Sequence, residues 1–172
     1  MRYSDMSIEA SYNFRNVDDE VTTSGSVGAD SLKALAEQGY EVVVNLLPDS
    51  SQYAVSGERE IVESQGLEYI HIPVDFEKPT RSDFEQFSQT MDRLRGKKIH
   101  VHCAANFRVT AFYSLHEVRR ARWSVNQAMA FIHGVWNPAE HAGWSEFMAV
   151  ILDGAEQSPQ PDRREDAAPD QR

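Results

Sequence analysis

The stretch "KKIHVHCAANFRVTAFYSLHEV", residues 97–118, contains the transition that decides the fold. An apolar run typical of a buried strand leads directly to Cys103, the only cysteine of the chain, and a helical pattern begins near Val109. Arg108 stands five positions after the cysteine, just before that helix. This order predicts a strand, a short loop and a helix. We therefore expect the loop amides and the helix N-terminus to bind an oxyanion together.

Strand and helix patterns alternate along the rest of the chain. The apolar runs at 40–48, 67–74 and 97–102 are typical of buried parallel strands, and a hairpin-like pair of short strands around Asp18 and Asp19 precedes them. The alternation predicts an α/β sandwich with a central, mostly parallel sheet and helices on both faces. In such sheets ligands bind beyond the carboxyl ends of the strands, which is where the cysteine loop lies.

The helix signals and the composition divide the chain into three parts. Residues 1–13 are expected to form an N-terminal arm, 14–154 a single domain, and 155–172 a disordered acidic tail without apolar periodicity. Within the domain, helices are expected at 29–39, at 58–66, after the capping residue Thr80, near Val109, after the capping residue Ser124, and at about 139–152.

The composition excludes several classes of function. The formal net charge of -10, from 27 acidic and 17 basic residues, argues against nucleic acid or an anionic membrane surface as the main partner. No apolar run approaches the roughly 20 residues that a membrane span needs, and the first ten residues contain no apolar core of a secretory signal. A cytoplasmic location is expected. The six histidines and one cysteine show no zinc spacing, so we expect no metal and no other cofactor.

The residues around Cys103 favour a reactive cysteine. The alternative is a buried structural cysteine at a strand end, since free cysteine is often buried. A histidine before Cys103, small residues after it, Arg108 and the following helix favour an oxyanion loop instead. The field that binds an oxyanion would also stabilise a thiolate, which is a nucleophile. Arg108 adds a planar fork of donors for two oxyanion oxygens.

The segment "VHCAANFRVTAF", residues 101–112, resembles the signature loop of cysteine-based protein tyrosine and dual-specificity phosphatases. More closely, the chain resembles a bacterial branch of that superfamily, which is related to phosphatase-like domains found beside β-lactamase-like hydrolases. The resemblance extends from about Phe14 to Leu152 and includes "VTTSGSV", "YEVVVNLLP", "LEYIHIPVDFEKPT" and "VWNPAEHAGWSEF". It implies a phosphatase-like sandwich fold and a phosphorylated substrate, either a protein or a small molecule.

The resemblance implies roles for individual residues. Cys103 would be the nucleophile, Arg108 would bind the phosphate oxygens, and His102 would orient the loop and help to tune the thiolate. Asp75, directly after the strand at 67–74, would protonate the leaving oxygen and then activate water. The amides that surround the oxygens would be those of Ala104, Ala105, Asn106, Phe107 and Arg108.

Asp75 and Asn45 also have structural interpretations. Asp75 could instead cap a turn before Pro79, and Asp83 and Glu77 compete with it for the role of general acid. In the resembling families an asparagine placed like Asn45 braces the cysteine loop. The alternative is an asparagine that forms a turn before the next proline.

The cysteine loop departs from the common phosphatase pattern in three ways. It has four residues between cysteine and arginine, where five are usual, and it contains no glycine. Asn106 is the residue expected to adopt a positive φ, because asparagine tolerates the left-handed region. The hydroxyl that usually follows the arginine is missing, since Val109 occupies that position and Thr110 comes one residue later.

Three functions therefore compete. The first is a cysteine-dependent phosphatase, which the histidine before Cys103, Asp75 and the helices after the loop favour. The second is a rhodanese-like sulfurtransferase, whose loops are commonly as short as this one and carry a persulfide. The third is a binding module that holds phosphate or sulfate with little or no turnover. A basic run at 119–122 is expected to complement a helix C-terminus, with an auxiliary contact to an anionic substrate as the alternative. The oligomeric state stays open.

Overall fold

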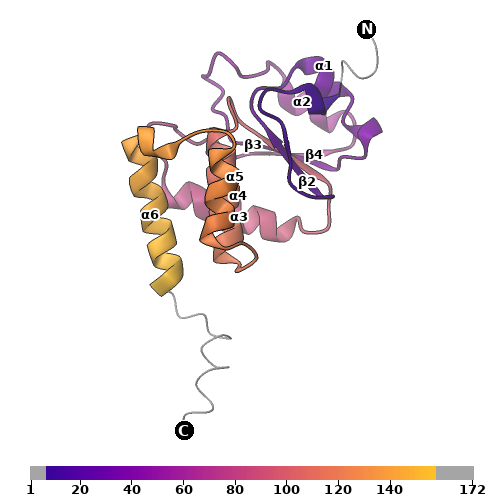
Figure 1. The fold of residues 1–172 in the computed structure, drawn as a ribbon. Coiled ribbons are helices and arrows are strands. Elements are labelled where there is room, and N and C mark those ends of the chain that lie inside the picture. The colour runs from indigo at the N-terminus through magenta and orange to yellow at the C-terminus, as the bar shows by residue number, and fades with distance from the viewer. Residues whose placement is uncertain (1–6, 158–172) are drawn as a thin grey trace.

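A computed structural model of the chain describes residues 7–157 (Figure 1). Its five strands form one sheet in the order β1-β2-β5-β3-β4. Only β1 and β2 pair antiparallel, and the other neighbours are parallel, so the predicted mostly parallel sheet is confirmed. The strands are β1 (Arg15–Asn16), β2 (Val21–Ser24), β3 (Val42–Asn45), β4 (Glu68–His71) and β5 (Ile99–His102).

Helices cover both faces of the sheet, as predicted. One face packs against α1, η3 and α2, and the other against α3 to α6 (Figure 1). The α-helices are α1 (Ala29–Lys33), α2 (Glu58–Glu63), α3 (Arg81–Arg93), α4 (Phe107–Arg119), α5 (Val125–His133) and α6 (Ala142–Gln157). The short 3-10 helices are η2 (Ile8–Ala10), η3 (Ala36–Gln38) and η4 (Pro138–Glu140).

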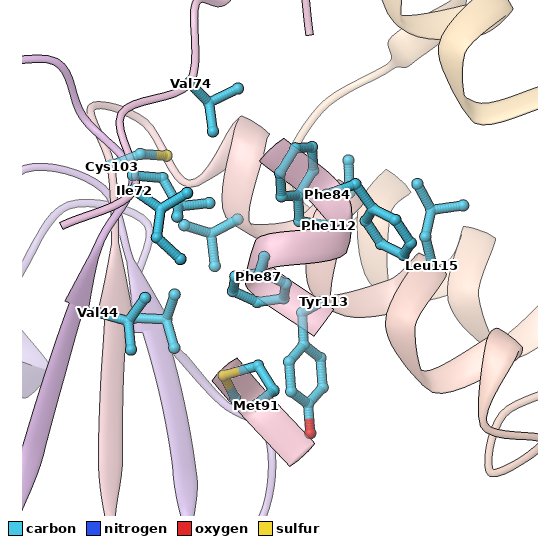
Figure 2. Close-up of a cluster of buried hydrophobic side chains, with 14 of the residues drawn as sticks. Val44, Ile72, Val74, Phe84, Phe87, Met91, Cys103, Phe112, Tyr113 and Leu115 are labelled. Atoms are coloured by element: carbon cyan, nitrogen blue, oxygen red, sulfur yellow. The ribbon is translucent and has the colours of Figure 1, made fainter. Parts of the chain in front are cut away.

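β3 is apolar on both sides from Val42 to Val44. Val42 and Val44 belong to the cluster beneath α3 to α6, whereas Val43 belongs to the cluster beneath α1 and α2. Successive side chains of a strand point to opposite faces, so helices on both faces of the sheet bury all three valines. Figure 2 shows the larger cluster, in which Phe84 and Phe87 of α3 pack close to Phe112 of α4.

Side-chain caps define the starts of α3 and α5. The Thr80 side chain accepts a hydrogen bond from the Asp83 amide at 3.1 Å at the start of α3. α5 begins with the reciprocal capping box of Ser124 and Gln127. The single helix predicted over 29–39 is instead divided into α1 and η3, and Gly39 ends it with a φ of 89°.

The ends of the domain differ from the sequence prediction. Residues 1–6 of the predicted arm lie outside the described residues, but Ile8 is fully buried against the cluster under α1. This part of the segment is therefore packed on the domain, because its apolar side chain has a place in the core. α6 continues to Gln157, past the predicted boundary at 154, and the rest of the predicted tail lies outside the described residues. Within residues 7–157, no helix has both the length and the apolar character that crossing a membrane requires.

Candidate functional site

Cys103 lies at the carboxyl end of β5, where the parallel sheet meets α4. Its amide donates to the Ser24 carbonyl oxygen at 3.2 Å, which extends the β2–β5 pairing by one residue. The side chain has no exposed surface, and Figure 2 shows its sulfur directed from the sheet toward the helices, near Ile72 and Val74. The sulfur is therefore closed to solvent in this structure.

Asn106 adopts the backbone conformation that the sequence predicted. Its φ of 70° and ψ of 11° lie in the left-handed region, and it is the N-cap of α4. The helix begins at Phe107, two residues earlier than the expected start near Val109. Arg108 thus belongs to the first turn, where backbone amides have no partner within the helix. The short loop and the helix N-terminus form one continuous run of amides.

Two carbonyl groups of the loop accept hydrogen bonds from the N-terminal part of the chain. Ser26 donates its amide to the Ala104 oxygen at 2.8 Å, and Asn13 donates its side-chain nitrogen to the Ala105 oxygen at 3.0 Å. Within residues 7–157, the backbone amides of 104–106 donate no hydrogen bond. This geometry fits the predicted oxyanion cradle, because the acceptors of the loop are occupied and the donors are free.

Arg108 is held against the segment that follows β4. Its Nε donates to the Val74 oxygen at 2.9 Å, and its guanidinium carbon lies 5.2 Å from the centroid of the Phe76 ring. The two terminal nitrogens have no hydrogen-bond partner in the part of the chain that the structure describes. They are available to two oxygens of an anion.

Asp75 is exposed and forms a turn. Its Oδ1 accepts from the Glu77 amide at 2.9 Å, and its carbonyl oxygen accepts from the Lys78 amide at 3.1 Å. This is the turn geometry considered as the alternative to an acid role. The Arg108 contact with Val74 nevertheless attaches the segment that carries Asp75 to the cysteine loop. Asp75 as general acid stays a prediction, with Glu77 and Asp83 as its competitors.

His102 forms a buried hydrogen bond that sequence reasoning missed. Its Nε2 lies 2.6 Å from Oε2 of Glu58, and the two side chains are 2% and 5% exposed. Removing one partner would leave a buried polar group without its hydrogen bond, so this contact holds His102 in place directly before the loop. Glu58 is the first residue of α2. An acidic residue in a first helical turn is common, and therefore nothing in the sequence distinguishes Glu58.

Asn45 forms the turn considered for it. Its Oδ1 accepts from the Leu47 amide at 2.8 Å, directly after β3. Its Nδ2 lies 3.0 Å from the Tyr69 hydroxyl oxygen and 3.4 Å from Oε1 of Glu58. Burial raises the pKa of Tyr69 to about 12, so its phenol stays neutral. Within the described residues Asn45 has no direct hydrogen bond to the cysteine loop, and its role as a brace, here through Glu58 and His102, stays a prediction.

The structure does not place Thr110 as a donor to the sulfur. Its side chain is fully buried, and its Oγ1 donates to the Phe107 oxygen at 3.1 Å and accepts from Trp136 Nε1 at 3.0 Å. A hydroxyl has a single proton, which is used here on the backbone. Thr110 instead fastens the start of α4 to Trp136, whose ring also stacks on Phe107 with centroids 4.6 Å apart.

The other strand histidines, His100 of β5 and His71 of β4, form hydrogen bonds within the fold. His100 Nδ1 and Nε2 each lie 2.8 Å from a hydroxyl oxygen, of Thr22 and Ser24 respectively. Burial holds the pKa of His100 well below its usual range, so the ring is neutral. His71 donates to a backbone carbonyl. Nowhere in residues 7–157 do three histidine, cysteine, aspartate or glutamate side chains gather closely enough to bind a metal ion.

Comparisons with known proteins identify the family and agree with the fold. A family described as "DSP-PTPase phosphatase fused to NAD+ Kinase" matches residues 6–140. A crystal structure of a putative phosphatase (DUF442) from Shewanella putrefaciens CN-32 is 30% identical, with a TM-score of 0.76 over 87% of this chain and 95% of that chain. TpbA of P. aeruginosa shares the fold, with 15% identity and a TM-score of 0.66 over 84% of this chain and 88% of that chain.

A curated relative is much longer than this chain. The beta-lactamase hydrolase-like protein of Agrobacterium fabrum (strain C58) is 26% identical over 109 residues. The match covers 62% of this chain and 25% of that protein, so it concerns about a quarter of the relative's length. The part of the sequence prediction that concerned the phosphatase family and domains beside β-lactamase-like hydrolases is confirmed.

Proposed function

Because the chain belongs to the DSP-PTPase phosphatase family, we propose that it is a cysteine-dependent hydrolase of phosphate monoesters, on a phosphoprotein or a small phosphorylated molecule. One observation carries this proposal. Within the described residues the amides of 104–106 are free at the N-terminus of α4, beside the Arg108 guanidinium, whose terminal nitrogens are unpaired there. Such an arrangement is suited to a tetrahedral dianion.

The proposed reaction has two displacements. In the first, the Cys103 thiolate forms a bond to phosphorus as the bond from phosphorus to the ester oxygen breaks, and Asp75 protonates the departing oxygen. In the second, the Asp75 carboxylate takes a proton from water, whose oxygen attacks phosphorus and releases the thiolate and inorganic phosphate. The amides and Arg108 stabilise the charge on the equatorial oxygens in both steps.

Access to the nucleophile is part of this proposal. Cys103 has no exposed surface, and Arg108 is bonded to Val74 in the segment that carries Asp75. We expect movement of this segment to accompany substrate binding, with Arg108 exchanging or adding partners as the phosphate enters. Asp75 would then turn from the Glu77 amide toward the leaving oxygen.

The length of the loop predicts slow turnover. With four residues between Cys103 and Arg108, one amide of the usual cradle is missing. The anion should sit higher in the smaller ring and bind more weakly. We therefore expect measurable but poor hydrolysis, with only weak inhibition by phosphate or sulfate.

The same loop length favours a second candidate, a sulfurtransferase of the rhodanese type. In that reaction the Cys103 thiolate would take a sulfur atom from a donor such as thiosulfate, releasing sulfite, and pass it as a persulfide to cyanide. A module that binds an oxyanion without turnover is the third candidate. The family match favours the phosphatase.

Parallel turnover assays separate the three candidates. Wild type and Cys103→Ser are each tested with an aryl phosphate and with thiosulfate plus cyanide. We expect wild type to release phosphate, and Cys103→Ser to fold and bind phosphate without turnover. Thiocyanate formation without phosphate release would favour the sulfurtransferase, and neither product would favour the binding module. Substantial aryl phosphate hydrolysis by Cys103→Ser would contradict the cysteine mechanism.

A further inference from the structure

The segment that precedes β1 contacts the cysteine loop through a reciprocal pair of asparagines. Asn13 donates its Nδ2 to the Ala105 oxygen at 3.0 Å, and Asn106 donates its Nδ2 to the Asn13 oxygen at 2.8 Å. Both asparagines have a positive φ, 54° at Asn13 and 70° at Asn106. The Asn106 side chain thus joins two left-handed residues 93 positions apart, and the Asn13 side chain bonds the carbonyl of the preceding loop residue, Ala105.

We propose that Asn13 is a positioning residue, which holds the cysteine loop in its oxyanion-binding conformation. This inference rests on the proposed function only in its use of the loop as an oxyanion site. Asn13 touches neither Cys103 nor Arg108 through any hydrogen bond of the described residues, so it would act through the loop backbone.

Peptide geometry explains how Asn13 would control the amides. The Ala105 carbonyl and the Asn106 amide belong to one planar trans peptide group, so they point in opposite directions. Fixing the carbonyl on the side of Asn13 therefore fixes the amide on the opposite side. The Ser26 amide fixes the Ala104 carbonyl in the same way, and with it the Ala105 amide. Two successive loop amides are oriented by donors from the N-terminal part of the chain.

Close backbone approach makes this support possible. A Cβ on Gly25 would lie 2.5 Å from the Ala104 oxygen and 2.7 Å from the Ala105 Cα, so only glycine fits there. The Gly25 amide donates to the Tyr12 oxygen at 2.7 Å, which holds Asn13 beside the loop. The loop itself has no glycine, so its left-handed position is occupied by Asn106. The asparagine pair and Gly25 together stabilise a conformation that the loop sequence alone does not favour.

The test measures the binding of inorganic phosphate to the full chain by calorimetry. Asn13→Gly keeps a residue that tolerates positive φ but removes the side-chain donor. Asn13→Asp keeps size and backbone tolerance but directs a carboxylate toward the Ala105 carbonyl. The matched control is Asn16→Ala, which changes an exposed asparagine three residues away on β1.

We expect phosphate affinity to fall about tenfold in Asn13→Gly, the effect of one lost hydrogen bond, and further in Asn13→Asp. Asn16→Ala should bind as wild type does. Melting temperatures and circular dichroism confirm that each variant is folded at the temperature of the measurement. The ¹H–¹⁵N shifts of the Ala105 and Asn106 amides give a second readout, since a purely structural role would not alter their response to phosphate.

Two results would overturn the inference. One is phosphate binding by both Asn13 variants with the affinity of wild type, and the other is no phosphate binding by wild type. Failure of the proposed function gives a different pattern. If wild type binds phosphate, the Asn13 variants bind it weakly and no aryl phosphate is hydrolysed, then the phosphatase proposal fails and the role of Asn13 is supported.

Discussion

The arginines at the two ends of α4 differ in how their charges are paired. At its C-terminal end, each of three arginines is paired with a carboxylate, Arg119 with Glu85, Arg120 with Asp92 and Arg122 with Glu117. At its N-terminal end, no carboxylate of the described residues pairs with Arg108, and the loop amides are free. The helix dipole favours cations at the C-terminal end and anions at the N-terminal end. The charges at the C-terminal end are thus paired within the fold, whereas the N-terminal end is left to bind an anion from outside.

This difference also decides between two interpretations of the basic run at 119–122. The 13 residues of α4 span about 20 Å, so the run lies far from the cysteine loop. Its arginines complement the helix C-terminus, as predicted, and the alternative of an auxiliary contact to a substrate in the cysteine loop does not fit.

Two buried histidines repeat the contrast. His116, near the C-terminal end, has partners on both ring nitrogens, with Nδ1 2.8 Å from the Ser88 hydroxyl and Nε2 accepting from Arg122 at 3.2 Å. His102, before the cysteine loop, pairs with Glu58, but its Nδ1 has no partner among the described residues. The hydrogen bonding of the buried histidine is complete near the C-terminal end of the helix and incomplete before its N-terminal end. Substitutions at matched positions of the two ends test whether this difference is functional.

The largest effect is expected at Arg108. Arg108→Lys keeps the charge but removes the planar fork, so aryl phosphate hydrolysis should fall about a hundredfold, equivalent to ~3 kcal/mol in the transition state. Steady-state kinetics of kcat/KM measure the loss. The matched control is Arg119→Lys, where the arginine is already paired with Glu85 at the other end of the helix.

Arg119→Lys should leave turnover within about twofold, because this partly exposed pair lies at the other end of the helix and lysine can still pair with Glu85. Its effect should be confined to a small change in the free energy of unfolding. Equal losses of activity in both variants would break the comparison, since the two ends would then be equivalent in function. Near-normal kinetics of Arg108→Lys would remove the phosphate-binding role from this residue.

A smaller and substrate-dependent effect is expected at Asp75. Asp75→Asn should slow the hydrolysis of alkyl phosphates by about ten- to a hundredfold, because a poor leaving group needs a proton as it departs. Activated aryl phosphates, whose leaving groups depart as anions, should be affected much less. The ratio of the two rates in each variant measures the effect.

Glu77→Gln and Asp83→Asn are the matched controls, since both residues compete for the same role. Neither should change the ratio of rates. If Asp75→Asn slows both substrates equally, its turn with the Glu77 amide is the function of Asp75. A changed ratio in a control variant would identify that residue as the acid instead.

The sequence predicted those features that depend on neighbours along the chain. The buried run at β3, the capping box at Ser124 and the left-handed Asn106 follow from side-chain alternation, capping chemistry and the conformational tolerance of asparagine. Asn13 and Glu58 were not predicted, because their partners lie 92 and 44 positions away. Long-range contacts of this kind leave no periodic signal, and both residues have types that are common in turns and helix starts.

Whether the Thr110 hydroxyl would reach the sulfur was left open by the sequence. Trp136, 26 positions later, donates to Thr110 Oγ1 and orients it. The competing partner could be seen only in the folded chain.

The last and smallest effect concerns stability at the C-terminal end of α4. Burial lowers the pKa of His116 to about 4 from its ordinary value of 6.5. Asp92 and Glu117 oppose this shift, and Arg120 and Arg122 reinforce it. The unfolded chain therefore binds a proton more readily than the folded chain between these two pH values. The free energy of unfolding should decrease as the pH falls from 6.5 to about 4, by about 2 kcal/mol between pH 7 and pH 5 from this residue.

Urea unfolding at pH 7 and pH 5 measures this contribution. His116→Gln should reduce the loss of stability between the two pH values by about 2 kcal/mol, while His133→Gln, at an exposed position on α5, should leave it unchanged. His100, whose pKa is also lowered, accounts for a remaining decrease in the same range. The pKa of Asp92 is lowered by its hydrogen bond with Arg120, so this carboxylate contributes only below its ordinary range and does not disturb the measurement. An unchanged pH dependence in His116→Gln would show that protonation of His116, at the C-terminal end of α4, does not destabilise the fold. The two ends of the helix would then differ only in their capacity to bind an anion.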